Sequence, residues 1–287
     1  MTLPPVEWRL RSRTLDTDDH TLVMGVLNVT PDSFSDGGRY LDQAAAIAHG
    51  LAMHDDGADL VDVGGESTRP GADPVGAEDE MDRVLPVVAA LAAEGVVVSV
   101  DTSKATVAKE AIAAGAEVVN DVTALADPDM APVCADAGVG MVLMHMRGTP
   151  STMQEDPVYA DVVAEVASHL AYRVAFATRN GIDERRVCID PGIGFGKTPH
   201  HNLALLGNLD FLAAMGRPVL VGTSRKRFIA SVLEAAGVAV AADQRDVATG
   251  ATVALAIARG ASVVRVHDVA GGLQVARMAD AIVRSGR

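Results

Sequence analysis

Short apolar runs recur along the chain, and each is followed by a polar or glycine-rich segment and then by an alanine-rich stretch. The runs are rich in Val and Ile and do not alternate with polar positions, which is typical of strands buried on both faces. Their starts lie about 34 residues apart on average, a length that fits one strand and one helix. The eight runs are residues 22–27, 60–63, 96–100, 117–120, 141–144, 187–189, 218–221 and 262–266.

Amphipathic stretches between the runs predict helices. The clearest are residues 42–55, 77–93, 103–113 and 159–180, with two more at 247–258 and 271–285. Many such stretches stop at glycine, which adopts the left-handed backbone geometry that ends helices. The predicted helix stops are Gly57, Gly95, Gly115, Gly138, Gly181 and Gly260.

The alternation of strand and helix predicts an α/β fold with a parallel sheet, and eight units predict a closed (β/α)8 TIM barrel. The alternative is an open, doubly wound sheet, which usually carries a GxGxxG turn after its first strand. Here the first strand leads instead into Asn28-Val29-Thr30-Pro31. No linker divides the chain, so we expect a single barrel domain at residues 21–287. Residues 1–20 form an N-terminal extension, read as a hairpin that closes the barrel base.

Composition narrows the possible cellular locations and binding partners of the protein. The 287 residues, 49% of them hydrophobic, suffice for one large core, and no segment has the length of a membrane helix or the apolar core of a signal peptide. The two cysteines, Cys134 and Cys188, form no CxxC pair, so we expect a reducing, cytoplasmic location. A net charge of −14 argues against nucleic acid as a partner.

Polar side chains follow the predicted strands, and the strand ends of a barrel carry its active site. Carboxylates and an amide, at Asp101, Asp190 and Asn120, suit the amide and amino edges of a flat heterocycle such as a pterin. A local basic cluster suits a phosphate or carboxylate on an otherwise acidic protein. Its members are Arg69, Lys226, Arg265 and His267; the other strand-end polar residues are Asn28, Asp62, Glu66, His145 and Ser224.

Eight segments, in order over nearly the whole chain, resemble the dihydropteroate synthase family. They are NVTPDSFSDGG (28–38), DVGGESTRPGA (62–72), SVDTSK (99–104), VVNDVTA (118–124), MHMRGTPSTMQ (144–154), DPGIGFGKT (190–198), GTSRKRFI (222–229) and RVHDV (265–269). One such segment would be weak support, whereas eight at matching spacing leave little room for chance. A phosphate-binding P-loop in the sixth segment is rejected, because proline stands at position 191 where that motif needs glycine.

The resemblance implies substrates and residue roles. The substrates would be a pterin diphosphate and p-aminobenzoate, and the implied catalytic set is Asp32, Phe34, Ser35, Asp101, Lys226 and Arg265. The pterin would be held by Asp101, Asn120, Val122, Met144, Asp190, Phe195, Gly222, Lys226 and Arg265. The diphosphate would be held by Asn28, Thr68, Arg69, Arg265 and His267, with Asn28 also ligating Mg²⁺. The p-aminobenzoate pocket would comprise Phe34, Thr68, Arg69, Pro70, Ser224, Lys226 and Arg227.

The implied reaction is loss of pyrophosphate from the pterin methylene, followed by attack of the arylamine on the resulting cation. Two other functions stay open: a pterin-binding paralogue with weak or no turnover, and a methyltransferase domain that uses methyltetrahydrofolate. The methyltransferases should lack the SRK and RVHDV segments, which are present here at residues 224–226 and 265–269. We also expect a homodimer formed through the last helices, and competition of sulfonamides with p-aminobenzoate.

Overall fold

The computed structural model describes residues 6–30, 39–67 and 71–285, of which the side chains of residues 39–42 are left aside. Eight parallel strands form one sheet in the order β8-β7-β6-β5-β4-β3-β10-β9. The two end strands meet through a parallel bridge between Ile189 and Val219, with Ile189 N donating to Pro218 O at 2.9 Å. The sheet is therefore closed, and the open-sheet alternative is wrong.

The strands of the barrel are short and almost wholly buried, as the apolar runs predict. The shortest strand, β9, keeps only two residues of the predicted run 218–221, because Pro218 has no N–H to donate to a ladder. The eight strands are β3 (Leu22–Asn28), β4 (Leu60–Gly64), β5 (Val98–Asp101), β6 (Val118–Asp121), β7 (Gly140–Met144), β8 (Val187–Asp190), β9 (Leu220–Val221) and β10 (Val263–Val266).

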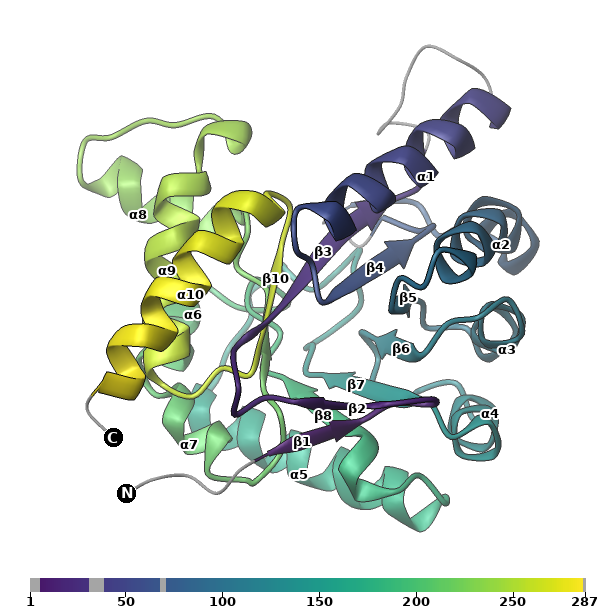
Figure 1. The fold of residues 1–287 in the computed structure, drawn as a ribbon. Coiled ribbons are helices and arrows are strands. Elements are labelled where there is room, and N and C mark those ends of the chain that lie inside the picture. The colour runs from purple at the N-terminus through teal and green to yellow at the C-terminus, as the bar shows by residue number, and fades with distance from the viewer. Residues whose placement is uncertain (1–5, 31–38, 68–70, 286–287) are drawn as a thin grey trace.

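Helices surround the barrel (Figure 1). They are α1 (Arg39–Asp55), α2 (Ala77–Ala93), α3 (Ala105–Ala113), α4 (Met130–Ala137), α5 (Val162–Arg179), α6 (Pro199–Gly207), α7 (Leu209–Ala213), α8 (Arg227–Ala235), α9 (Asp246–Ala258) and α10 (Val269–Ser285). All six glycines predicted to stop helices have positive φ, between 63° and 118°. The α5 helix starts later than predicted because Asp161 caps it, accepting hydrogen bonds from Val163 N and Ala164 N.

The N-terminal residues form the predicted hairpin, with β1 (Glu7–Arg9) antiparallel to β2 (Thr14–Asp16). Trp8 and Leu10 are fully buried and pack against inward-facing strand residues such as Met24 and Cys188. The Trp8 indole donates a hydrogen bond to Arg186 O at 2.9 Å. This hairpin fills the barrel at the end opposite the carboxyl ends of the strands. The other and larger core cluster joins the outer faces of the strands to the helices.

Candidate active site

The carboxyl ends of neighbouring strands bring several predicted site residues together. In the β5–β6 ladder Asp101 lies opposite Asn120, and in the β7–β8 ladder Met144 lies opposite Asp190. Parallel strands in register deliver their last side chains to one level of the barrel. The strand-end residues therefore share one rim, as the sequence predicts.

A buried polar network joins four strands, β4, β5, β6 and β10, across this rim. Arg265 Nε lies 2.7 Å from Asp62 Oδ2, and Arg265 Nη2 lies 3.0 Å from Asp101 Oδ2. Asn120 Nδ2 donates to the same Asp62 oxygen at 2.9 Å. The side chain of Asp62 is fully buried, that of Asp101 is 12% exposed and that of Arg265 21% exposed. The guanidinium thus holds two carboxylates at one wall of the site.

Asp62 is the residue in this network to which the sequence reasoning assigned no role. It was noted at the end of its strand, but its partner Arg265 is 203 positions away in the chain. Its other oxygen, Oδ1, is buried and has no hydrogen-bond partner among the described residues. Asp62 therefore orients Arg265 and Asn120 from within the barrel.

Asp190 ends β8, and Lys226 lies on the segment after β9, the neighbour of the Arg265 strand β10. The Lys226 ammonium donates to Ile193 O and lies 4.6 Å from the centroid of the Phe195 ring. Asp190 Oδ1 accepts from Gly192 N at 2.6 Å, which folds the carboxylate under its own loop. A Cβ added at Gly222 would lie 3.6 Å from Arg265 Cβ and 3.8 Å from Lys226 Nζ, so Gly222 lies between these two cations.

Burial shifts the protonation of these groups. Burial, reinforced by the charge of Asp62, raises the pKa of Asp101 to about 7 although Arg265 opposes the shift. Burial likewise raises the pKa of Asp190 against the attraction of Lys226. The pKa of Lys226 falls to about 8, again because burial disfavours the charged form. Such shifts are common where titratable groups converge for catalysis.

His267 and Ser224 form a second cluster beside Arg265. Ser224 Oγ lies 2.9 Å from His267 Nδ1 and accepts a hydrogen bond from His267 N at 3.2 Å. Lys226 precedes the first residue of α8, Arg227, which is exposed. The structure thus places three of the residues predicted for the p-aminobenzoate pocket on one short segment after β9.

Other predicted residues lie at the rim or outside the described chain. Asn28 ends β3, opposite Gly64, and Val122 is buried just beyond β6. Six predicted residues fall outside the described residues, namely Asp32, Phe34, Ser35, Thr68, Arg69 and Pro70.

Two charged clusters beneath the rim were missed by sequence reasoning. Lys104 Nζ bonds Glu66, and lies 2.6 Å from Oε2 of the fully buried Glu80. Lys197 is also buried, at 2% exposure. No local pattern marks either lysine, because a lysine is usually a surface residue and its burial depends on segments far away in sequence.

Comparisons with known proteins agree with the fold and identify the family. The sequence model of the family described as pterin binding enzyme matches residues 24–267. The chain belongs to this family of pterin-binding enzymes. Within the family it falls among the dihydropteroate synthases, as three relatives indicate.

The first relative, the dihydropteroate synthase of Mycobacterium leprae, is 51% identical over 92% of this chain and 94% of its own length. The second is the solved structure of the Xanthomonas albilineans dihydropteroate synthase with 4-aminobenzoic acid, which is 46% identical with a TM-score of 0.89. It covers 97% of this chain and 98% of its own. The third, a Yersinia pestis dihydropteroate synthase in complex with a sulfonamide drug, is 40% identical with a TM-score of 0.90, covering 98% of this chain and 100% of its own.

Proposed function

We propose that this protein joins 6-hydroxymethyl-7,8-dihydropterin diphosphate to p-aminobenzoate, giving 7,8-dihydropteroate and pyrophosphate. The observation that carries the proposal is the convergence of two carboxylates, Asp101 and Asp190, and two cations, Lys226 and Arg265, on one barrel rim. A heterocycle with donor and acceptor edges joined to an anionic leaving group fits this set. The similarity to dihydropteroate synthases over nearly the full chain supports the same reaction.

The pterin lies against the residues at the ends of β5, β6 and β8. Asp101, Asn120 and Asp190 accept hydrogen bonds from its amino and ring N–H groups, and Lys226 donates to its acceptors. Arg265 stacks on the ring, and the slot is lined by Val122, Met144, Phe195 and Gly222. Because the carboxylates stand close to the pterin methylene, they stabilise the positive charge that develops there when its C–O bond breaks.

The leaving pyrophosphate faces the basic part of the rim. Arg265 and His267 hold the diphosphate together with Asn28, and Thr68 and Arg69 complete this set. The departing oxygens take up negative charge as the C–O bond breaks, and fixed cations stabilise that charge. No protein nucleophile takes part: the arylamine nitrogen forms the new C–N bond and then releases a proton.

The residues suit Mg²⁺ that arrives with the diphosphate better than a resident ion. No group of three or more His, Cys, Asp or Glu side chains within the described ranges could hold a metal. Mg²⁺ commonly binds through one or two protein ligands together with substrate phosphates and water. Asn28 would supply one amide oxygen, and the ion would neutralise the leaving group. Removal of Mg²⁺ with a chelator should therefore weaken diphosphate binding, measured by calorimetry, and Asn28→Ala should reduce that metal dependence.

The p-aminobenzoate pocket lies beside α8. Ser224, Lys226 and Arg227 come from the segment that begins this helix, where free backbone N–H groups and the basic side chains favour a carboxylate. The resemblance to the family adds Phe34, Thr68, Arg69 and Pro70 to the residues expected at this pocket. A sulfonamide resembles p-aminobenzoate in shape, so it should inhibit competitively with it. Inhibition that no concentration of p-aminobenzoate relieves would argue against this pocket.

The test of the function is turnover of the pterin diphosphate with p-aminobenzoate and Mg²⁺, followed by release of pyrophosphate and formation of dihydropteroate. Lys226→Ala should lose activity by about 10²-fold or more, because it removes a hydrogen-bond donor used in both pockets. Lys109→Ala, an exposed lysine on α3, is the matched control and should retain full activity. Tight pterin binding without product would favour the inactive paralogue, and methyl transfer from methyltetrahydrofolate would favour the methyltransferase.

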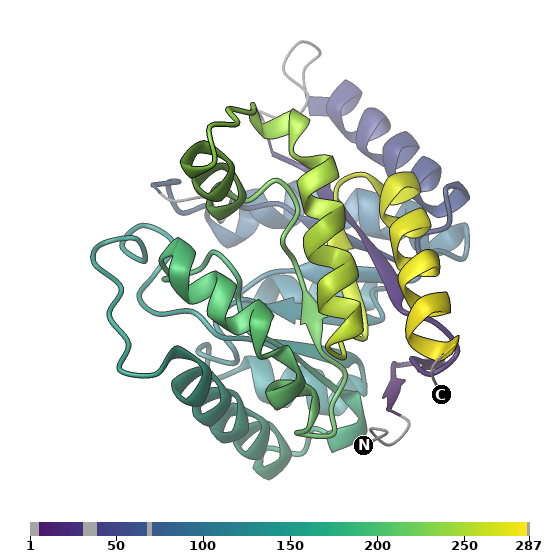
Figure 2. The same cartoon turned by 90° about the vertical axis from the view of Figure 1, so that its left-hand side faces the viewer.

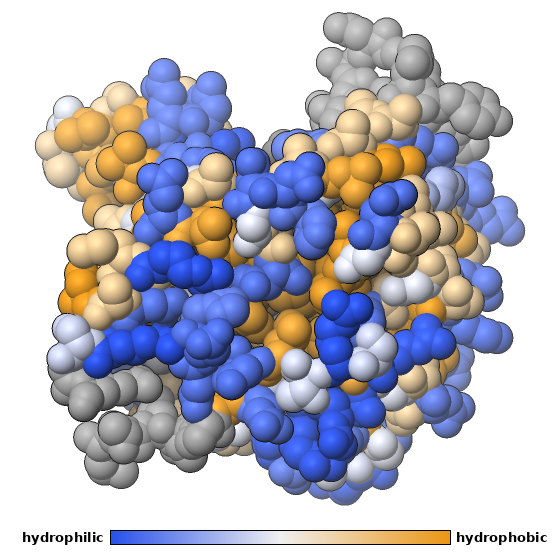
Figure 3. All heavy atoms as spheres, in the orientation of Figure 1, coloured by the Kyte–Doolittle hydropathy of each residue, from blue (hydrophilic) through white to orange (hydrophobic). Residues whose placement is uncertain are grey.

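We also propose a cytoplasmic homodimer. Two neighbouring helices, α9 and α10, lie side by side on one face of the barrel (Figure 2). Their outward side chains include Val247 (89% exposed), Leu255 (63%), Met278 (63%) and Ile282 (61%). Apolar side chains also gather around α8, whereas hydrophilic ones cover much of the face in Figure 3. A second copy would cover the α9–α10 face.

The dimer can be tested by changing its apolar face. Val247→Glu combined with Met278→Glu should convert the dimer to a monomer in sedimentation velocity, and an unchanged sedimentation coefficient would contradict the interface. A cytoplasmic location is supported by the two cysteines, which are free and buried. No helix within the described residues has the length and hydropathy needed to cross a bilayer.

A further inference from the structure

The loop after β8 is folded around a buried lysine. Lys197 Nζ lies 2.9 Å from Gly192 O, 2.9 Å from Phe195 O and 3.2 Å from His145 O. Its fourth neighbour is His145 Nδ1, at 2.9 Å. These acceptors are three carbonyl oxygens and a ring nitrogen, not carboxylates. Burial lowers the pKa of Lys197 to about 7, and in its charged form the ammonium is a donor only, which can hold several carbonyls at fixed directions.

The ammonium joins two segments that end adjacent strands. His145 directly follows β7, and the segment 191–197 follows β8; His145 N also donates to Asp190 O at 2.9 Å. The two backbones touch so closely that a Cβ at Gly192 would lie 1.9 Å from His145 O. Gly192, Gly194 and Gly196 all have positive φ, from 61° to 86°. The fully buried Ile193 and the hydrogen bond from Gly194 N to Asn202 Oδ1 at 2.7 Å also anchor this loop, and Lys197 adds the contacts that join it to the segment after β7.

Several residues assigned to the pterin slot lie on these two segments or directly next to them. Met144 precedes His145, Asp190 opens the loop, and Phe195 is itself held through its carbonyl. Ile193 O, between the two carbonyls bound by Lys197, accepts the Lys226 ammonium. Displacement of the loop would therefore move the carboxylate, the ring and the second lysine together.

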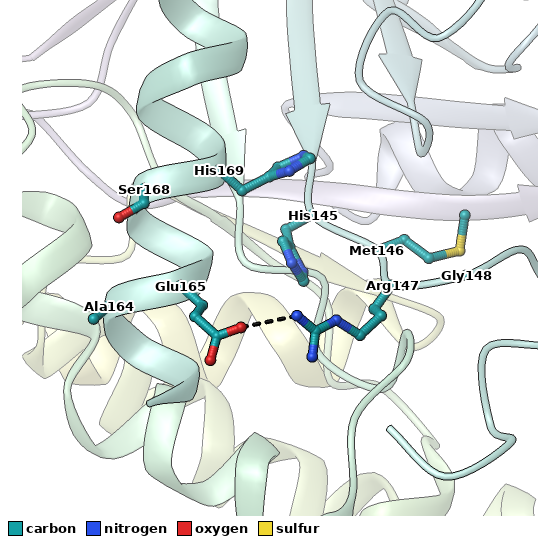
Figure 4. Close-up of a pocket in the computed structure, with 8 residues that line it drawn as sticks. All are labelled: His145, Met146, Arg147, Gly148, Ala164, Glu165, Ser168 and His169. Carbon is teal, nitrogen blue, oxygen red and sulfur yellow. Dashed lines mark hydrogen bonds and ion pairs between the residues drawn. The ribbon is translucent and has the colours of Figure 1, made fainter. Parts of the chain in front are cut away.

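His145 serves as the neutral partner of the lysine. Its Nδ1 faces a donor, so the ring accepts there and carries its proton on Nε2. Burial, with the nearby Lys197 charge, lowers the pKa of His145 to about 2, which keeps the ring neutral. Figure 4 shows His145 beyond the end of its strand, with His169 projecting from α5 beside it. The two rings meet edge to face with centroids 4.9 Å apart, which fixes the imidazole plane.

We propose that Lys197 is a positioning residue for the pterin: from beneath the loop it fixes Asp190, Phe195 and the Ile193 carbonyl, with His145 as its neutral acceptor. The role rests on the proposed function in that the ligand is the pterin diphosphate. It predicts a selective effect. Of the p-aminobenzoate residues on the segment after β9, Lys226 is the one that bonds this loop, through Ile193 O, so loss of Lys197 should weaken pterin binding more than p-aminobenzoate binding.

The test compares Lys197→Met with Lys109→Met, an exposed lysine on α3, in the full-length protein. Lys197→Met should raise the Kd of the pterin diphosphate, measured by calorimetry, and its KM by about tenfold or more, the effect of losing hydrogen bonds from a buried charged donor. The KM for p-aminobenzoate at saturating pterin should change less than about threefold. Equal changes in both KM values, or a lower Tm with both unchanged, would overturn the proposal.

A second pair of variants keeps the test decisive should Lys197→Met fail to fold. In His145→Asn the Oδ1 atom stands where the ring has Nδ1 and preserves the acceptor, whereas His145→Leu removes it. Pterin affinity should stay within about threefold in the first and fall about tenfold in the second. Similar affinities for the two variants would contradict the proposal. Calorimetry keeps the outcome separate from the proposed function, because pterin binding is measured whether or not the wild type turns over.

Discussion

At the scale of the residue, the site depends on one guanidinium that serves two carboxylates. Arg265 is bound to the fully buried Asp62 and to Asp101, at 2.7 and 3.0 Å. The desolvation of such a group is offset only while its partners stay in place. Removal of the arginine leaves carboxylate charge in the barrel, so its effect should exceed that of an exposed ion pair.

Arg265→Ala should lower the free energy of unfolding by about 3 kcal/mol, as is typical when one partner of a buried pair is removed. Urea unfolding measures this loss, with Arg259→Ala as control. Arg259 lies 3.7 Å from Asp210 at an exposed pair and should contribute about 0.5 kcal/mol or less. Adding Asp62→Asn to Arg265→Ala should recover part of the loss, and no recovery would show that Asp62 is not the residue left unpaired.

The two shifted pKa values predict a pH dependence of kcat/KM. Asp101 acts as a carboxylate, so activity should rise as pH increases through its pKa of about 7. Lys226 acts as an ammonium, so activity should fall as pH increases through its pKa of about 8. The plot of kcat/KM against pH, measured from about pH 5.5 to 9.5, should therefore be bell-shaped with its maximum between these two pKa values. A flat profile would mean that neither ionisation limits the reaction.

At the scale of the element, two loops that follow strands are held by lysines, the buried Lys197 and the partly buried Lys104. The loop after β4 is tied by Glu66, whose Oε1 accepts from Val75 N at 3.2 Å while its Oε2 binds Lys104. Lys104 also binds the buried Glu80 of α2. The two ends of the segment 66–75 are thereby tied to each other and, through Lys104, to the starts of α2 and α3. This segment contains residues predicted to frame p-aminobenzoate.

Lys104→Met should therefore raise the KM for p-aminobenzoate by about tenfold, while the Kd of 6-hydroxymethyl-7,8-dihydropterin, which lacks the diphosphate assigned to Thr68 and Arg69, changes less than about twofold. Steady-state kinetics at saturating pterin and calorimetry measure the two quantities. The exposed Lys109→Met again serves as control. This pattern is the reverse of that expected for Lys197→Met, so the two lysines should separate the halves of the site. An equal loss of affinity for p-aminobenzoate and for the pterin would indicate instead that the variant destabilises the whole site.

At the scale of the whole molecule, the two ends of the barrel have different tasks. The rim carries the polar network, whereas the base is closed by the hairpin and its buried Trp8. In barrels of this class, residues at the base contribute to stability and residues at the rim to chemistry. Changes at the base should leave the site intact as long as the barrel stays folded.

Trp8→Ala should reduce the free energy of unfolding by about 3–5 kcal/mol, because a fully buried large side chain is replaced by a cavity. The substrate KM values, measured where the variant is folded, should stay within about twofold of the wild type. Trp8→Phe, which keeps most of the volume but loses the hydrogen bond to Arg186 O, should cost less. A large change in pterin KM would show that base and rim are coupled.

The sequence by itself determined the barrel and the members of its rim. Buried strands and glycine-stopped helices have local signatures, so the eight strands, the closed fold and the strand-end residues Asp101, Asn120 and Asp190 were predicted from periodicity. The resemblance added roles that geometry alone does not assign. The fold prediction and the roles implied by the resemblance both rest on information carried within a few neighbouring residues or within one motif.

Only the tertiary structure decided which side chains bind one another. Asp62 and Arg265 are 203 positions apart, and Lys197 reaches His145 across 52. Lysine in a loop reads locally as a surface residue, and nothing in DPGIGFGKT marks Lys197 as buried at 2% exposure. Closure of the barrel brings these groups together and removes water from them, and burial then sets both their pairing and their pKa values.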